Sequence, residues 1–367
     1  MKHMRIPSLA LAALLCVPAA AAPAAAAEEP LSRAASAQQA IEAAAQYGGA
    51  VSSQYALWQD GAITMTGHAG AFSRTENRAL TDQDLYGIGS VSKLYTTAAL
   101  LQLCEAGKVD LDAPVTRYLP GFTMADERYR DITVRMLLNH SSGLMGDSTR
   151  SAFLFDAYTG AGTDDLLERL STQLLKADPG AYSVYCNDGF TLAELVVEAV
   201  SGQDFTDYLR THLLEEAGLT RTFTPADDFD RDDLARIYQG SDTRALPADT
   251  LNIIGAGGLY ATASDLAAFG GLFCGDNDLL TDASWQSTAG EEYARGLWPE
   301  ESGDDALAYG LGWDNVHMYP FNHSGIPALV KGGDTLYYHA GLIVLPEEDM
   351  AVAVVSSGGV STYNQLA

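Results

Sequence analysis

Lysine, aromatic residues and positive charge are all scarce in this sequence of 367 residues. It contains only five lysines, and its 21 Lys and Arg residues stand against 48 Asp and Glu residues, which gives a formal net charge of −27 at pH 7. A surface of this charge repels nucleic acid and anionic lipid, so both are poor partners and no nucleic acid is expected to bind. Aromatic residues make up 9% of the chain and hydrophobic residues 47%. This composition is typical of a globular protein with a substantial core.

Cysteine is also rare, and its distribution bears on the cellular compartment. Residues 1–27 combine a basic start, a short apolar run and repeated A-x-A sites, which predicts a secretory signal peptide cleaved shortly before Glu28. The mature protein is then expected to be secreted or extracytoplasmic. A lipid anchor at Cys16 is an alternative, although the large Leu15 precedes it where a small residue is typical. Cleavage leaves three cysteines, and this odd number argues against a disulfide framework.

Long apolar runs and metal-binding patterns are missing from the rest of the chain. No later stretch reaches the roughly 18 consecutive apolar residues that a membrane-spanning helix needs, so we expect no transmembrane span in the mature chain. The sequence has neither an H-E-x-x-H pattern nor a cluster of histidines. This absence argues against metal-dependent hydrolysis, and no cofactor or metal is expected.

Segments rich in β-forming residues lie near both ends of the chain. Two apolar runs in residues 52–70 flank Asp60-Gly61, which predicts a hairpin, and residues 335–359 predict a second hairpin around the turn sequence PEED. Helices are expected at 36–47, 94–106 and 191–200, each followed within two residues by glycine.

The order of these elements predicts a mixed fold, α/β together with an all-α part. We expect an antiparallel sheet built from both chain ends (34–85 and 300–367) and flanked by helices, with a large, mainly helical insertion (86–299) between them. Residues 360–367 resemble the start of a closing helix. The chain is therefore expected to be truncated within that helix.

The sequence YGIGSVSKLYTT contains the first candidate site, because Ser90 precedes the rare Lys93 by three residues. Residues three apart share one face of a helix, so the hydroxyl and the amine can meet. A lysine held in apolar surroundings has a lowered pKa and can accept the hydroxyl proton. The alternative is that Ser90 caps the helix and Lys93 is solvated. The motif alone does not decide between them.

The sequence PGAYSVYCNDGF contains the second candidate, in which Tyr185 and Asn187 are two residues apart just before a predicted helix. In an extended segment such residues point the same way, so a phenol and an amide can face one site. A phenol beside two lysines is expected to have a lowered pKa and to move protons, and Asn187 is expected to hold a substrate amide. The alternative is a helix-entry turn with a packed tyrosine.

The sequence KGGDTLYYHAG contains the third candidate and opens a predicted strand. Lys331 is the other lysine expected near the site. Gly333 would let a substrate lie against the strand, and the N–H of Asp334 is a candidate donor to an oxyanion. The alternative is an ordinary turn into a strand, which Gly-Gly often marks.

In this order the three motifs resemble the active-site set of serine β-lactamases and penicillin-binding proteins: S-x-x-K, then Y-x-N, then K-x-G. The Y-x-N form is similar to class C β-lactamases and their D,D-carboxypeptidase and esterase relatives. Segments such as ITVRMLLNHSSGL, GAGGLYATASDLAAFGGLF and YGLGW add to the resemblance, which runs from about residue 36 to the end. It implies the family's fold and assigns site roles to Ser90, Lys93, Tyr185, Asn187, Lys331 and Gly333.

Two residues depart from the family pattern at the third motif. Gly332 replaces a hydroxyl residue that usually meets a substrate carboxylate, and Asp334 is an anion where a small neutral residue is usual. An anion about 4 Å from a substrate carboxylate costs roughly 4 kcal/mol at an intermediate dielectric. If Asp334 points inward, a neutral or cationic substrate is favoured. Thr335 is expected to face the opposite way.

The resemblance therefore implies a secreted serine hydrolase that forms an acyl-enzyme on Ser90. Its expected partner is a small-molecule or peptide substrate: a peptidoglycan-type peptide, a β-lactam or an ester. Whether Lys93 or Tyr185 is the first base stays open. The alternatives are a true class C-type β-lactamase and a non-catalytic module that senses cell wall. A Ser-His-Asp triad is disfavoured because the chain lacks a G-x-S-x-G elbow.

Overall fold

The computed structural model describes residues 32–155, 157–275, 277–290, 292 and 308–359. The predicted signal peptide (1–27) with Cys16, the predicted closing helix (360–367) and residues 300–307 of the predicted sheet domain lie outside the described residues. The proposed domain boundaries therefore stay a prediction.

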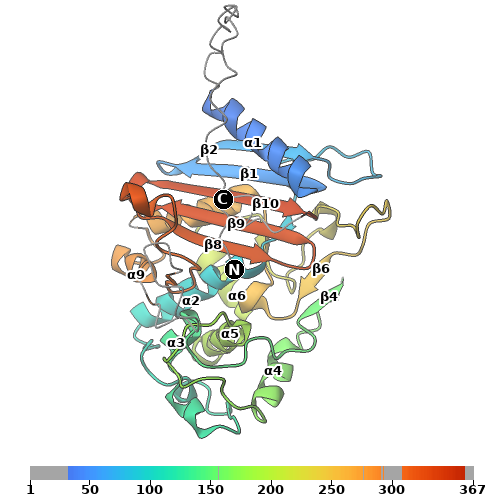
Figure 1. Ribbon diagram of the computed structural model, residues 1–367. Helices are drawn as coiled ribbons and strands as arrows, with labels where there is room; N and C mark the ends of the chain where they lie inside the picture. The colour runs from blue at the N-terminus through green and yellow to red at the C-terminus, as the bar shows by residue number, and fades with distance from the viewer. Residues whose placement is uncertain (1–31, 156, 276, 291, 293–307, 360–367) are drawn as a thin grey trace, which may run out of the picture.

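One five-stranded antiparallel sheet joins the two ends of the chain, as Figure 1 shows. Its strand order is β2-β1-β10-β9-β8, and β1 pairs with β10 in the register Ser52↔Ser357. The strands are β1 (Ser52–Gln59), β2 (Ala62–Gly70), β8 (Leu329–Asp334), β9 (Tyr338–Leu345) and β10 (Met350–Ser357). Both predicted hairpins are confirmed, since β1 and β2 are joined at Asp60-Gly61, and β9 and β10 by the short helix η8 (Pro346–Glu348). The predicted fold class is confirmed as well.

Helices cover both faces of this sheet. Helix α1 (Arg33–Gly48) lies over β1 and β2, while α8 (Ala263–Gly271) packs on the other face against β1, β9 and β10. Two glycines of α8 permit this close approach, because a Cβ atom at Gly270 would lie 2.8 Å from Leu342 and one at Gly271 would lie 2.3 Å from Trp58. Helix α8 thus belongs to the sheet layer, although its residues fall in the segment predicted to be helical insertion.

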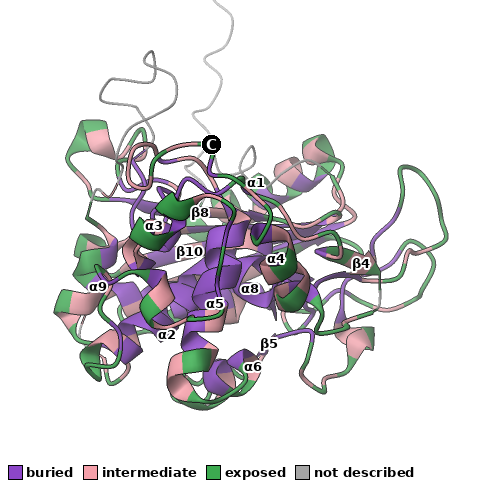
Figure 2. Ribbon diagram, turned by 90° about the horizontal axis from the view of Figure 1, so that it is seen from below, coloured by how far each residue is buried: buried purple, intermediate pink, exposed green. Residues whose placement is uncertain are grey.

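The rest of the middle segment forms the helical part. Helices α2 (Ser92–Glu105) and α5 (Asn187–Ser201) run through its centre, and Figure 2 shows α5 and α8 largely buried in the middle of the molecule. Around them lie α3 (Val134–Leu138), α4 (Gly162–Leu170), α6 (Phe205–Leu209), α7 (Ile254–Gly257) and α9 (Asp282–Thr288), with the short strands β3 (Tyr86–Gly87), β4 (Phe153–Phe155), β5 (Thr222–Phe223), β6 (Asp249–Leu251) and β7 (Tyr260–Ala261). None of the helices in the described ranges combines the length and apolar character that crossing a membrane requires.

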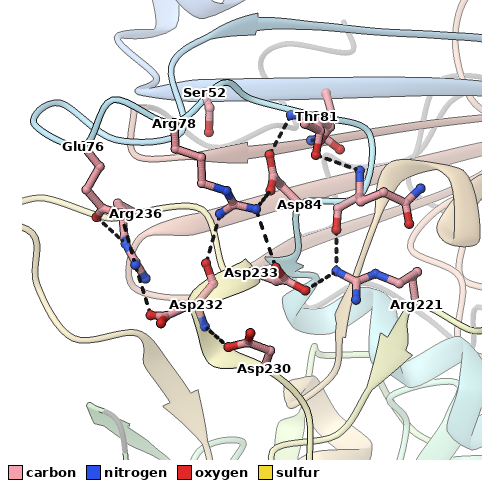
Figure 3. A network of polar contacts seen from close by, with 12 residues as sticks. Ser52, Glu76, Arg78, Thr81, Asp84, Arg221, Asp230, Asp232, Asp233 and Arg236 are labelled. Carbon is pink, nitrogen blue, oxygen red and sulfur yellow. Dashed lines mark hydrogen bonds and ion pairs between the residues drawn. The ribbon is translucent and has the colours of Figure 1, made fainter.

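A network of charged side chains secures the chain just before the first candidate motif (Figure 3). Asp84 is fully buried, and its carboxylate accepts hydrogen bonds from Arg78 at 2.5 Å and from the Thr81 N–H at 2.7 Å. Burial raises the pKa of Asp84, and these two partners oppose the rise. Arg78 also donates to the backbone oxygen of Asp232 at 3.0 Å. The network therefore ties the entry to β3 onto the segment around Asp232.

Replacing Arg78 by Met is expected to destabilise the protein by about 2 kcal/mol, because the buried Asp84 then lacks its counter-charge. Urea unfolding monitored by circular dichroism measures the change. Arg130→Met is the matched control, since Arg130 forms an exposed pair with Glu127 and such pairs contribute about 0.5 kcal/mol. Equal unfolding midpoints for the two variants would show that the Asp84 pair is not needed.

Candidate active site

Ser90 and Lys93 meet as the spacing predicts. Ser90 lies in a short 3₁₀ turn, η1 (Gly89–Val91), which runs directly into α2. Lys93 Nζ is 3.0 Å from Ser90 Oγ, and the lysine side chain is fully buried. No side chain caps either η1 or α2. The alternative of a capping serine beside a solvated lysine is therefore wrong.

The amine of Lys93 has two further partners from distant parts of the chain. It donates to Asn187 Oδ1 at 2.6 Å and to the backbone oxygen of Ala256, in α7, also at 2.6 Å. Burial lowers the pKa of Lys93 well below its usual value, and the charge of Lys331 lowers it further. Asn187 uses its other amide atom as well, because Nδ2 donates to Asp147 Oδ1 at 2.6 Å. Asn187 therefore orients Lys93, in addition to the substrate contact predicted for it.

Lys331 reaches the same site from β8 but comes with its own anion. Its fully buried Nζ forms an ion pair of 2.5 Å with Asp314 Oδ1, and Asp314 Oδ2 accepts from the Gly332 N–H at 3.0 Å. Burial lowers the pKa of Lys331, while Asp314 opposes this effect. Sequence reasoning missed Asp314 because nothing in YGLGWD marks the aspartate as a partner of Lys331.

Tyr185 lies between the two lysines. The centre of its ring is 4.8 Å from Lys93 Nζ and 5.0 Å from Lys331 Nζ, and its phenol is close enough to Ser90 for the serine to influence the pKa of the phenol. The expected lowered pKa is wrong: burial raises the pKa of Tyr185 well above its usual value, and Asp314 adds to the rise. The physical reason is that burial disfavours the charged phenolate, and the negative charge of Asp314 disfavours it further. The phenol is therefore neutral and holds a proton that it can donate.

His140 supports Tyr185 from behind, a contact that sequence reasoning missed. Its ring stacks on the Tyr185 ring with centroids 4.4 Å apart, and its Nδ1 accepts from the Cys186 N–H at 3.1 Å. Burial and the charge of Lys331 lower the pKa of His140 well below its usual value, so the ring is neutral. His140 also has a φ of 61°, in the left-handed region that residues other than glycine adopt uncommonly. No sequence pattern marks its contact with Tyr185.

Strand β8 touches the η1 turn backbone to backbone. A Cβ atom at Gly333 would lie 2.0 Å from the oxygen of Ile88 and 3.0 Å from the Ser90 nitrogen, and one at Gly89 would lie 2.6 Å from the Asp334 nitrogen. The interpretation of Gly333 as room for a substrate is corrected accordingly. Neighbouring backbone fills that space, and glycine is needed so that the nitrogens of Ser90 and Asp334 come close together.

The side chain of Asp334 points to the opposite face of β8 from Lys331, as strand alternation requires. It is half-exposed, and its Oδ1 lies 2.6 Å from His339 Nδ1 on β9. Thr335 is turned away from this position, since its hydroxyl donates to the buried Asp249 at 2.6 Å. The expectation that Thr335 faces away from Asp334 is confirmed, so it does not replace the missing hydroxyl at Gly332.

Glu194 fixes the carbonyl that receives Lys93. From α5 its Oε2 accepts from the Gly255 N–H at 2.7 Å, while Thr96 donates to the Gly255 oxygen at 2.8 Å. These two bonds hold α7, and with it the oxygen of Ala256. Burial raises the pKa of Glu194 to about 8, which makes this carboxyl a second titratable group beneath the site.

The raised pKa of Glu194 predicts a pH-dependent stability. The ordinary pKa is 4.5 and the folded value about 8, so the folded state favours the protonated form. The associated stability is complete below the unfolded pKa and is lost as pH rises toward the folded one, at about 1.4 kcal/mol for each pKa unit. Glu194→Gln is expected to flatten the fall in melting temperature between about pH 5 and pH 8.

Thermal unfolding across this pH range checks the prediction. Glu168→Gln is the control, because Glu168 is exposed on α4 and its replacement should leave the slope unchanged. A Glu194→Gln protein with the wild-type slope would show that this carboxyl does not take up a proton on folding.

Comparison with known proteins agrees with the fold. The Beta-lactamase family model matches residues 37–366. Penicillin-binding protein 4 of Amycolatopsis lactamdurans is 28% identical over 80% of this chain and 77% of its own length. The D-alanyl-D-alanine-carboxypeptidase/endopeptidase AmpH of Escherichia coli K12 is 28% identical over 73% of this chain and 69% of its own. A solved class C β-lactamase superposes with a TM-score of 0.74 at 17% identity, covering 92% of this chain and 96% of that one.

Proposed function

Because this chain belongs to the Beta-lactamase family, we propose that it is a secreted serine hydrolase that cleaves an amide or ester through an acyl-enzyme on Ser90. One observation carries the proposal: the fully buried amine of Lys93 lies 3.0 Å from Ser90 Oγ. The names of two relatives, a penicillin-binding protein and a D-alanyl-D-alanine-carboxypeptidase/endopeptidase, support a peptide substrate of the peptidoglycan type.

The contacts of Lys93 favour it as the first base. A neutral amine has two N–H donors and one lone pair. The donors match Asn187 Oδ1 and the Ala256 oxygen, both at 2.6 Å, which leaves the lone pair for the Ser90 hydroxyl. The lowered pKa of Lys93 supplies the neutral form. Lys93 takes the proton as Ser90 Oγ forms a bond to the substrate carbonyl carbon.

The negative charge then develops on the carbonyl oxygen. The N–H groups of Ser90 and Asp334, brought close by Gly89 and Gly333, are the donors we assign to this oxyanion, and each such donor contributes roughly 3 kcal/mol to the transition state. The oxyanion collapses, the bond from carbon to the leaving nitrogen or oxygen breaks, and the leaving group takes a proton.

Tyr185 is the proton donor to that leaving group. Its raised pKa keeps the phenol protonated, and its position beside Ser90 places the proton near the bond that breaks. Lys93 restores the phenol proton, and Lys331 lies near enough to favour the transient phenolate. Water then attacks the acyl carbon, the bond to Ser90 Oγ breaks, and Ser90 recovers its proton from the water through Tyr185 and Lys93.

Ser90→Ala is expected to lower turnover of p-nitrophenyl acetate by at least about a thousandfold, because no other group forms the acyl-enzyme. The same change should abolish labelling by a fluorophosphonate. Ser324→Ala is the control, since Ser324 is exposed in the η7 turn (Asn322–Ser324). Persistent labelling in the Ser90 variant would reject the assignment. A wild-type protein that neither labels nor turns over would favour the binding module.

Lys93→Met is expected to lower kcat/KM by about a hundredfold to ten-thousandfold, the range for loss of a general base. The sign of the pH dependence follows from the base being the neutral amine: wild-type activity rises as pH passes upward through the lowered pKa of Lys93. This rising limb should vanish in the variant and persist in the exposed control Lys108→Met. If the activity of the Lys93→Met variant still rose with pH as the wild-type activity does, Tyr185 would be the base instead.

A further inference from the structure

We infer that the leaving-group side of this site selects against substrates that carry a carboxylate there, because the protein's own carboxylates already occupy and surround the groups that would bind it. This inference rests on the proposed function and names its substrate class. The expected substrates are amides or esters whose leaving group is uncharged or cationic.

Asp314 satisfies the two donors that β8 offers at this position. It binds Lys331 Nζ at 2.5 Å and the Gly332 N–H at 3.0 Å. Backbone N–H groups alternate along a strand, so those of residues 330, 332 and 334 point to the same edge of β8. The Val330 N–H donates to Asn315 at 2.9 Å. Asp314 therefore sits on the same edge as the Asp334 nitrogen, about 7 Å along the strand from it.

When the Asp334 N–H binds the substrate carbonyl oxygen, the leaving group attached to that carbonyl can extend along β8 as far as Asp314. A substrate carboxylate placed there would compete with Asp314 for Lys331. It would also lack a hydroxyl partner, because residue 332 is glycine. A substrate carboxylate that competes with the buried pair of Lys331 and Asp314 gains little binding energy, because Lys331 and Asp314 have already lost their water in the folded protein.

Two more carboxylates lie at the edges of the site: Asp147 on the side of Lys93, and Asp334 at the end of β8 on the face opposite to Lys331. Asp334 is half-exposed at the end of β8 and is held by His339, while Asp147 is bound to Asn187 at 2.6 Å. Lys331 is the cation paired with Asp314, and Asp147 places a second negative charge beside the neutral Lys93. The local field is therefore negative, in line with the net charge of −27.

The surface beyond Asp334 adds an apolar element. Phe153, Phe155 and Leu336 are exposed there by 42%, 43% and 47%. They are neighbours because Phe155 pairs with Asp249 in the two-stranded β4–β6 sheet, and Asp249 accepts hydrogen bonds from both Thr335 and Tyr337. An uncharged leaving group can pack on such side chains, whereas a carboxylate loses hydration against them.

A matched set of aryl acetates tests this inference. The leaving phenol carries a meta carboxylate, carboxamide or trimethylammonium group, and each kcat/KM is divided by the ester's rate constant with hydroxide to remove differences in leaving ability. At about pH 8, above the ordinary pKa of histidine, the carboxamide ester is expected to exceed the carboxylate ester by at least about tenfold. The trimethylammonium ester should equal or exceed the carboxamide.

Two variants and a control locate the effect. Asp314→Asn and Asp334→Asn are each expected to narrow the carboxamide-to-carboxylate ratio by at least about threefold, and the ratio should also shrink between about 0.05 M and 0.5 M NaCl. Asp334→Asn leaves the ion pair between Lys331 and Asp314 intact, so the carboxamide-to-carboxylate ratio can be measured in this variant even if the Asp314→Asn protein does not fold. Asp60→Asn is the control: it removes the same charge at the β1–β2 turn, at the other end of the sheet.

The outcomes separate this inference from the proposed function. A wild-type enzyme that turns over the carboxylate ester as well as the carboxamide ester, with both activities dependent on Ser90, overturns the inference and leaves the proposed function standing. The inference is also overturned if neither Asp314→Asn nor Asp334→Asn changes the carboxamide-to-carboxylate ratio of kcat/KM. If no ester is hydrolysed in a Ser90-dependent manner, the proposed function itself fails, and the inference fails with it.

Discussion

The burial of two lysines around one tyrosine is the constraint on which the site depends. The two amines lie 4.8 Å and 5.0 Å from the centre of the Tyr185 ring. In a medium of low dielectric, two ammonium groups around one side chain repel each other strongly. The structure resolves the conflict with a single carboxylate, because Asp314 pairs with Lys331 at 2.5 Å and not with Lys93. Asp314 therefore opposes the fall in the pKa of Lys331, whereas the pKa of Lys93 is lowered well below its usual value. The division of labour between base and cation follows from where one aspartate lies.

The second constraint is the close contact of two backbone segments. Strand β8 and the η1 turn approach so closely that a single methyl group at Gly333 would overlap the oxygen of Ile88. This contact aligns the nitrogens of Ser90 and Asp334, and it can form only because the sheet unites the two ends of the chain. The network around Asp84 and the bonds of Glu194 to α7 then hold the other walls in place.

Much of the fold was predictable because its signals are local. Asp60-Gly61 and the PEED turn mark hairpins through turn chemistry, and the apolar residues around Lys93 indicate a buried helix. The order of three motifs predicted the family. The place of α8 was not predictable, because a helix covering a sheet and a helix inside a bundle share the same apolar pattern in the sequence. Only the packing of Gly271 against Trp58 tells them apart.

The site was predictable as a set of residues but not as a set of charge states. The resemblance of three ordered motifs to a known family indicated Ser90, Lys93, Tyr185, Asn187 and Lys331, whereas each motif by itself left a structural alternative open. The raised pKa of Tyr185, the part played by Asp314 and the support from His140 were decided only by the tertiary structure. The physical reason is that a pKa depends on burial and on charges within a few ångströms, and those neighbours come from segments that the sequence order keeps far apart.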